Sequence, residues 1–233
     1  ESAPRTVRVG ATGLKGGWGS SAFYYKHKLE NRRGGLLLLS PTTLIFSIIL
    51  IIAAFFMQDK GLLSIFSIAV YFQIFTVGQS QINKELYKPF IYLVPEPPFT
   101  KLLHCLRELL PSALAEALVV FIPVGLIFDL SSVGILICVV ARVSYAFLFQ
   151  SGNLLVERFW SNAGKALVIL LYFLILIALM LPGIVLGTVL TIVFALPGGM
   201  LPGLLLAALV NIPVSLLLLF FLRNMLQYAE YNR

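Results

Sequence analysis

Few residues in this chain could do chemistry, and two of them, Glu116 and Arg142, lie inside long apolar runs. If those runs cross a membrane, the two ionisable side chains are costly there, and such residues are typically kept for function or for pairing with each other. Both fall in the same halves of two consecutive, antiparallel segments, so an ion pair between them is geometrically allowed. Alternatively, Glu116 reaches the interface and Arg142 extends its guanidinium group to the headgroups. The sequence leaves both interpretations open.

The other reactive residue types form no recognisable catalytic or metal-binding pattern. His27 and His104 are the only histidines, and neither belongs to an H-E-x-x-H motif or to a group of acidic or cysteine ligands. Cys105 lies in a charged segment and Cys138 in an apolar run, so we interpret both as reduced residues rather than a disulfide. No serine occupies a G-x-S-x-G motif. We therefore expect no catalytic residue, no metal and no cofactor in this chain.

The sequence also contains no nucleotide-binding loop. A P-loop requires G-x-x-x-x-G-K-[ST], whose backbone amides hold the phosphates, and the stretches GATGLKGG and SNAGKAL lack its spacing or its glycine-rich turn. Any ATP hydrolysis linked to this chain is expected on another chain or in a part of the protein outside this sequence. The chain itself is predicted not to be an enzyme.

The composition indicates a membrane protein. Hydrophobic residues make up 59% of the 233 residues, charged residues make up 12%, and the mean hydropathy is +0.96. Soluble globular domains are about half apolar and about a quarter charged. Several runs approach or exceed the roughly 20 apolar residues that cross a bilayer as a helix, and none alternates like a barrel strand. The sequence therefore predicts an all-α, multi-pass membrane protein.

Six apolar runs predict six membrane-spanning helices within a transmembrane domain over residues 36–222. The spans are expected at about residues 36–57, 62–78, 112–128, 133–149, 165–181 and 204–222. Residues 182–203 are interrupted by Pro182, Gly183, Gly187, Pro197, Gly198, Gly199, Pro202 and Gly203. This pattern predicts a re-entrant or external broken helical hairpin, since such backbone is tolerated at membrane depth only where its polar groups find partners. Seven spans with an external tail is the alternative.

Lysine and arginine flank the runs unevenly, which predicts the orientation, because short cytoplasmic loops are enriched in these residues. If both termini are cytoplasmic, the external turns hold only Lys60. The internal segments then hold Arg5, Arg8, Lys15, Lys26, Lys28, Arg32, Arg33, Lys84, Lys88, Lys101, Arg107, Arg158, Lys165, Arg223 and Arg233. Residues 1–35 form a cytoplasmic segment with an interfacial amphipathic helix, and residues 223–233 form a cytoplasmic tail. The net charge of +7 thus reflects orientation, and no nucleic-acid partner is expected.

One charged segment, residues 84–109, interrupts the apolar runs with seven formal charges. Its sequence, KELYKPFIYLVPEPPFTKLLHCLREL, predicts a cytoplasmic loop over residues 80–110 that contains a short helix, a proline break and an amphipathic helix from Phe99 to Leu110. The leucine side of that helix would face lipid or the spans. The polar side would be free for a protein partner. A surface helix that lies in the interface without a partner is the alternative.

The order of these segments resembles the membrane domain of type-2 ABC export permeases, from about residue 21 to the end. The stretches GLKGGWGSSAFYYKHKLENRRGG and QINKELYKPFIYLVPEPPFTKLLHCLREL are similar, more narrowly, to the bacterial putative ABC exporter family. This resemblance implies that the loop contains a coupling helix that docks on a separate ABC ATPase subunit, which binds ATP and Mg²⁺. The implied docking residues are Glu85, Tyr87, Lys88, Lys101, His104, Arg107 and Glu108.

The resemblance also implies a substrate path between two permease copies or halves, lined by the second and fifth spans. The candidate lining residues are Tyr71, Phe72, Phe75, Tyr172 and Phe173. Aromatic residues that face lipid or fill the core are the alternative. Because the sequence starts at Glu1 without an apolar leader, we expect a processed chain or a piece of a longer protein.

The expected function is a permease subunit of an ATP-driven exporter in the bacterial inner membrane, working by alternating access. A membrane scaffold or assembly factor that recruits a cytoplasmic partner without transport is the alternative. A membrane-embedded lipid enzyme is a third reading, and the chain lacks the acidic, histidine or cysteine constellation that it would need.

Overall fold

The computed structural model describes residues 19–33, 39–58, 61–78, 82, 90–107, 109–160, 163–193 and 200–226. Within these ranges the regular structure is helical, and no strand is present. The helices are α1 (Ser21–Arg33), α2 (Pro41–Phe56), α3 (Leu62–Gly78), α5 (Phe90–Leu93), α6 (Pro98–Leu106), α7 (Leu109–Ile127), α8 (Ser132–Trp160), α9 (Lys165–Val193) and α10 (Leu201–Phe221). The predicted all-α fold class is confirmed for the described part of the chain.

Four helical stretches among the described residues are long and apolar enough to cross a membrane. They are Pro98–Ile127, Ser132–Trp160, Ala166–Val193 and Leu201–Phe221. With 29 residues each, α8 and α9 reach about 43 Å, more than the hydrocarbon core of about 30 Å. Helices α2 and α3 are apolar but have 16 and 17 residues, or about 24 to 26 Å. The chain is a membrane protein, and the predicted number of six spans is not confirmed.

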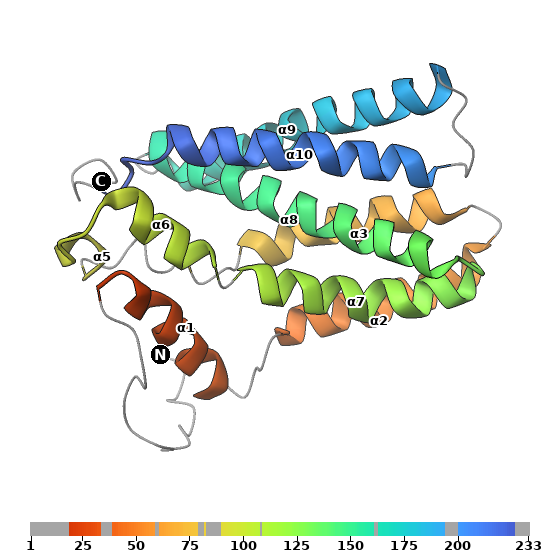
Figure 1. Ribbon diagram of the computed structural model, residues 1–233, viewed down its shortest axis with the longest axis horizontal. Helices are drawn as coiled ribbons and strands as arrows, with labels where there is room; N and C mark the ends of the chain where they lie inside the picture. Colours follow the sequence, from red (N-terminus) through yellow and green to blue (C-terminus); the bar gives the residue numbers. More distant parts are fainter. Residues whose placement is uncertain are drawn as a thin grey trace.

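Helix α8 forms the centre of the bundle (Figure 1) and packs against α3, α7, α9 and α10. In its most apolar stretch 61% of the residues are buried, compared with 11% in α9. Small residues allow the close approach that membrane helices need for packing. A Cβ added at Gly152, for example, would come within 2.6 Å of Leu176 on α9. Helix α8 therefore fixes the positions of its neighbours, whereas α9 faces outward.

A first apolar core, here called the bundle core, joins the long helices. Phe66 on α3 packs on Phe121 of α7 and Tyr145 of α8, with ring centroids 5.5 and 6.2 Å apart. Such tilted aromatic pairs add to the packing that holds membrane helices together. Leu50 from α2, Leu176 from α9 and Leu204 from α10 belong to the same cluster. One continuous core thus unites six helices.

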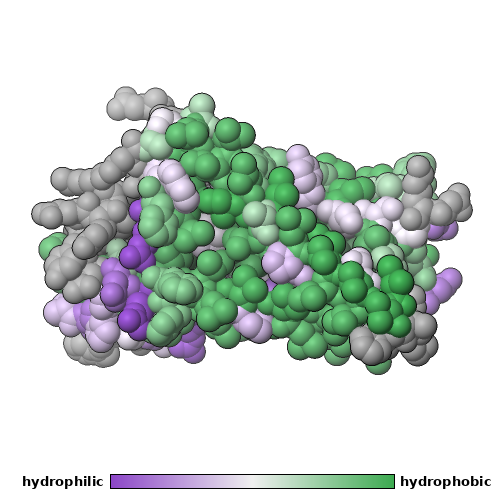
Figure 2. Space-filling view, turned by 90° about the horizontal axis from the view of Figure 1, so that it is seen from above, coloured by the Kyte–Doolittle hydropathy of each residue, from purple (hydrophilic) through white to green (hydrophobic). Residues whose placement is uncertain are grey.

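A second core lies at one end of the bundle, where α1, α5 and α6 form what we call the end lobe (Figure 1). This lobe core consists of Phe23, Ile82, Ile91, Leu102, Cys105, Leu106, Leu154, Leu219, Leu222, Met225 and Leu226. It includes residues from the last turns of α8 and α10, so the end lobe rests directly on two helices of the bundle. Hydrophilic residues gather at this end in the space-filling view, and most of the remaining face is hydrophobic (Figure 2).

The broken hairpin predicted for residues 182–203 is not confirmed by the described residues. Helix α9 continues through Pro182, and residues 194–199 lie outside the described part. A Cβ at Gly187 would come within 2.6 Å of the carbonyl oxygen of Gly203 on α10. The two backbones therefore pack closely, and this packing keeps the glycine-containing segment helical where its local sequence favours a break. The predicted break at Pro182 is contradicted by the continuous helix.

Candidate functional site

Helix α6 lies where the sequence predicts an amphipathic helix, and it starts at Pro98. Proline is well tolerated at this first position, because a backbone N–H there would have no partner within the helix. Leu102, Cys105 and Leu106 point into the lobe core, while Leu103 is 44% exposed. The predicted helix from Phe99 to Leu110 corresponds to α6, which ends at Leu106, and to the first residues of α7, which begins at Leu109; residue 108 lies outside the described residues. Helix α6 therefore presents one free face next to the start of α7.

Lys101 is predicted from the sequence to lie on the free face of this helix, but the structure buries it. Its side chain is only 3% exposed, and its ammonium group donates a hydrogen bond to the backbone oxygen of Ile91 at 3.1 Å. The long apolar stem of lysine can be buried at modest cost when the head group finds such an acceptor. Lys101 therefore fixes α6 to α5 and is not available to a partner in this fold.

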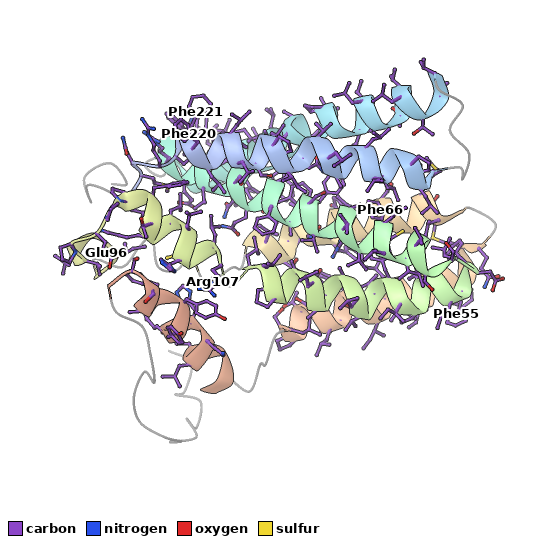
Figure 3. All side chains as sticks on the ribbon, in the orientation of Figure 1. Phe55, Phe66, Glu96, Arg107, Phe220 and Phe221 are labelled. Atoms are coloured by element: carbon purple, nitrogen blue, oxygen red, sulfur yellow. The ribbon has the colours of Figure 1, made fainter. Side chains whose placement is uncertain are left out.

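Two contacts hold α1 against α6. One involves Glu96, just before α6, and the other involves Arg107, just after it (Figure 3). The Glu96 carboxylate lies at the start of α1, where Gly19 has φ +57° and a Cβ would overlap the carboxylate. Hydrogen bonds from the side chain and then the backbone of Ser20 hold the pKa of Glu96 below its usual range. At the other end, the guanidinium of Arg107 lies 5.0 Å from the centre of the Tyr24 ring.

Two of the seven predicted docking residues are therefore in a position to meet a partner. Arg107 is exposed and His104 is half-buried, both beside the exposed Leu103. Of the other five, Lys101 is buried, and Glu85, Tyr87, Lys88 and Glu108 lie outside the described residues. The described part of the predicted docking surface thus consists of Leu103 and His104 on α6 and Arg107 directly after it.

The structure brings Glu116 and Arg142 together as an ion pair between α7 and α8. The Arg142 side chain is 1% exposed, so it does not extend to the interface. Its Nη2 atom donates to the Glu116 carboxylate and its Nη1 atom to the backbone oxygen of Ala69 on α3. Pairing with an opposite charge and a carbonyl is what makes a buried guanidinium tolerable at membrane depth.

Sequence reasoning missed a further member of this polar group, Gln73. Its Nε2 atom donates to the backbone oxygen of Arg142 at 3.2 Å, which ties α3 to α8 a second time. On the other side of α8, the Asn211 amide of α10 donates to the Ser144 hydroxyl at 3.4 Å. Uncharged polar residues inside apolar runs were the available signal, since such side chains bond across membrane helices. Polar contacts thus connect α3, α7, α8 and α10 through α8.

The five aromatic residues predicted to line a substrate path lie together between α3 and α9. The ring centroids of Phe75 and Phe173 are 5.8 Å apart, and Tyr71 packs on Phe75 at 5.4 Å. Phe72 contacts Tyr71, and the Tyr172 hydroxyl donates to the backbone oxygen of Ile74 at 2.7 Å. Tyr71 is 54% exposed and Phe75 37%. Phe72, Tyr172 and Phe173 are half-buried and pack against the bundle core. We call this group the aromatic cluster.

The described residues offer no metal centre, because they contain no group of three or more histidine, cysteine or acidic side chains that could hold an ion. A free helix face on the end lobe is connected by packing and polar contacts to the long apolar helices.

A comparison with protein families matches residues 5–230 to the family described as "Putative ABC exporter". The comparisons with curated proteins and with solved structures gave no match. The matched region includes the end lobe and every described helix of the bundle.

Proposed function

Since the chain belongs to the putative ABC exporter family, we propose that it is the membrane-spanning permease subunit of an ATP-driven exporter. Family membership and its apolar helices identify it as a membrane transport component. In the proposed complex a separate ABC ATPase subunit binds ATP and Mg²⁺ and closes around the bound nucleotide. The end lobe faces the cytoplasm and receives that motion.

The observation that supports this role most strongly is the double attachment of α6. Along the chain, α6 leads into α7 with Arg107 and one further residue between them. In space, Leu102 and Leu106 of α6 share the lobe core with residues at the ends of α8 and α10. A load on α6 would therefore reach three long helices through covalent connection and packing, which is how coupling travels in folded proteins.

Polar contacts around α8 join the helices that would move together in the proposed cycle. The Glu116–Arg142 pair and the bond from Gln73 join α7, α8 and α3, so these helices would shift together. In that proposal the aromatic cluster, which bridges α3 and α9, changes its exposure during the cycle. A second copy or half of the permease would complete the substrate path on that side.

The docking surface is proposed to combine the exposed face of α6 with residues 85–88 of the same loop. A double charge reversal, Glu85→Lys with Lys88→Glu, tests this without touching a described contact of the lobe core. We expect affinity-purified wild-type chain to bring down an ABC ATPase with measurable ATP hydrolysis, and the double variant to lose at least about 90% of it, as complementary surface charges govern such docking. The matched control is Lys60→Glu, on the predicted external turn, which should retain the ATPase. Co-purification that is equal for all three chains would refute the docking surface.

A further inference from the structure

A groove of about 660 Å³ opens on the side of the bundle next to the end lobe. Its volume is in the range of about 300–1,000 Å³ that small-molecule sites occupy. Helix α8 forms its floor, and α7 and α10, which both pack on α8, form its walls. The apolar lining includes Leu110, Leu114, Val143, Phe147, Ile212 and Leu216. We call it the side groove.

The lining of the side groove suits hydrocarbon better than a polar solute. Its two serines already have partners, since the Ser144 hydroxyl donates to the backbone oxygen of Ala141 and the Ser215 hydroxyl to that of Asn211, both at 2.7 Å. A polar molecule would therefore leave water without gaining equivalent hydrogen bonds. Leu216 on the α10 wall is 59% exposed, so the groove is open to the lipid phase from the side.

The end of the groove nearest the end lobe is basic. His104 of α6 and Arg107, which directly follows α6, line it there, and no acidic residue is among the described residues that line the groove. The guanidinium carbon of Arg107 lies over the Tyr24 ring, 5.0 Å from its centre, and Arg107 also lines the groove. A contact with a ring face uses none of the five N–H donors of a guanidinium. A planar fork of N–H donors is well suited to phosphate oxygens. The site therefore joins a hydrocarbon groove to a phosphate-binding group.

We propose that the side groove binds an anionic phospholipid from the leaflet on the α6 side, with one acyl chain along α8 and the phosphate at Arg107. Basic pockets between membrane helices on the cytoplasmic side recognise anionic headgroups in this way, and the proposed orientation places α6 on that side. The acyl chain fills a groove that protein atoms leave open, and the headgroup meets the guanidinium of Arg107. A lipid here would touch α6, α7, α8 and α10 at once. The inference depends on the groove and not on the proposed ATPase.

A photo-crosslinking experiment on the full chain in lipid nanodiscs tests the proposal. The probes are phosphatidylglycerol and phosphatidylcholine that carry the same diazirine on one acyl chain, and mass spectrometry identifies the labelled peptides. We expect phosphatidylglycerol to label peptides containing Phe147 and Leu216 about five-fold more than phosphatidylcholine does, the effect of one well-placed arginine.

Two matched pairs of variants separate a bound lipid from bulk lipid. Leu216→Trp fills the groove and should remove this labelling, whereas Leu217→Trp, on an adjacent position that is equally 59% exposed and does not line the groove, should keep it. Arg107→Gln should bring the ratio of the two lipids to about one, whereas Arg223→Gln, which removes another exposed arginine, should leave it unchanged.

Three results would overturn the proposal. The first is equal labelling by the two lipids in the wild-type chain, and the second is labelling that Leu216→Trp does not reduce. The third is a lack of labelling of the groove peptides by both lipids, which would show that something other than lipid, such as a second copy of the chain, covers the groove.

Discussion

The bundle core and the lobe core hold helices together by different means. In the bundle core the polar groups that matter are enclosed, as in the Glu116–Arg142 pair, whose arginine is 1% exposed. In the end lobe the polar contacts lie at the boundary with water, where Glu96 meets the start of α1 and the exposed Arg107 lies over the Tyr24 ring. Buried pairs are costly to break, whereas exposed ones contribute little each. The bundle helices should therefore be harder to separate from one another than α1 is to separate from α6.

The largest expected effect comes from separating the two charges inside the bundle. Glu116→Arg or Arg142→Glu leaves like charges buried together, and we expect a loss of about 3–5 kcal/mol in the free energy of unfolding. The double variant, which exchanges the charges, should recover part of this loss because a pair is restored. Denaturant unfolding of the four chains in detergent measures the difference. Losses that simply add in the double variant would remove the pair as a stabilising contact.

A pair of glycines contrasts the two regions directly. Gly187→Ala places a Cβ 2.6 Å from a backbone oxygen of α10, which cannot move alone, so the bundle should lose about 1–3 kcal/mol. Gly19→Ala meets a side chain, the Glu96 carboxylate, and also strains the positive φ, at about 1–2 kcal/mol. The loss in Gly187→Ala should appear in global unfolding. The loss in Gly19→Ala should appear only as faster hydrogen exchange in α1.

The control for this pair is Gly164→Ala, where a Cβ would meet nothing within 4 Å, so no change is expected. If Gly19→Ala destabilised the whole bundle as much as Gly187→Ala, the two regions would not be separable.

The smallest effect should be a pH dependence confined to the end lobe. Because the pKa of Glu96 is lowered in the folded chain, its contribution is fully present above the ordinary glutamate pKa of about 4.3 and is lost as the pH falls through the lowered value. We expect hydrogen exchange in α1 to accelerate over that acidic window while exchange in α8 does not change. Glu96→Gln should abolish this local pH dependence. The same acceleration in the Gln variant would assign it to other carboxylates.

The sequence predicts a helix well where its own length and hydropathy determine where it begins and ends. It predicts less well where packing against a neighbouring helix determines this. The runs that became α3, α7, α8 and α10 are recognisable because about 20 apolar residues have few other uses. Helix α9 is longer than predicted because its glycines pack on α10, and Pro182 by itself indicates a break. Close contact between two backbones is not visible in one segment's sequence.

The candidate site divides in the same way. The position of α6 follows from its amphipathic pattern and its prolines, but the burial of Lys101 does not, because its acceptor is a backbone oxygen of α5. Likewise the sequence allows the Glu116–Arg142 pair without choosing it over interfacial positions, since the choice depends on how α7 is rotated against α8. Residue types indicate what could pair, and tertiary packing determines what does.

Hydrogen exchange of the detergent-solubilised chain, alone and with its co-purified ATPase, tests the central claim most directly. The account predicts that the ATPase protects peptides of α6 that contain Leu103 and Arg107, and that added ATP then alters exchange at the ends of α7 and α8. Protection confined to the outward face of α9, with no change in α6, would contradict the end lobe as the place where the chain receives its motion.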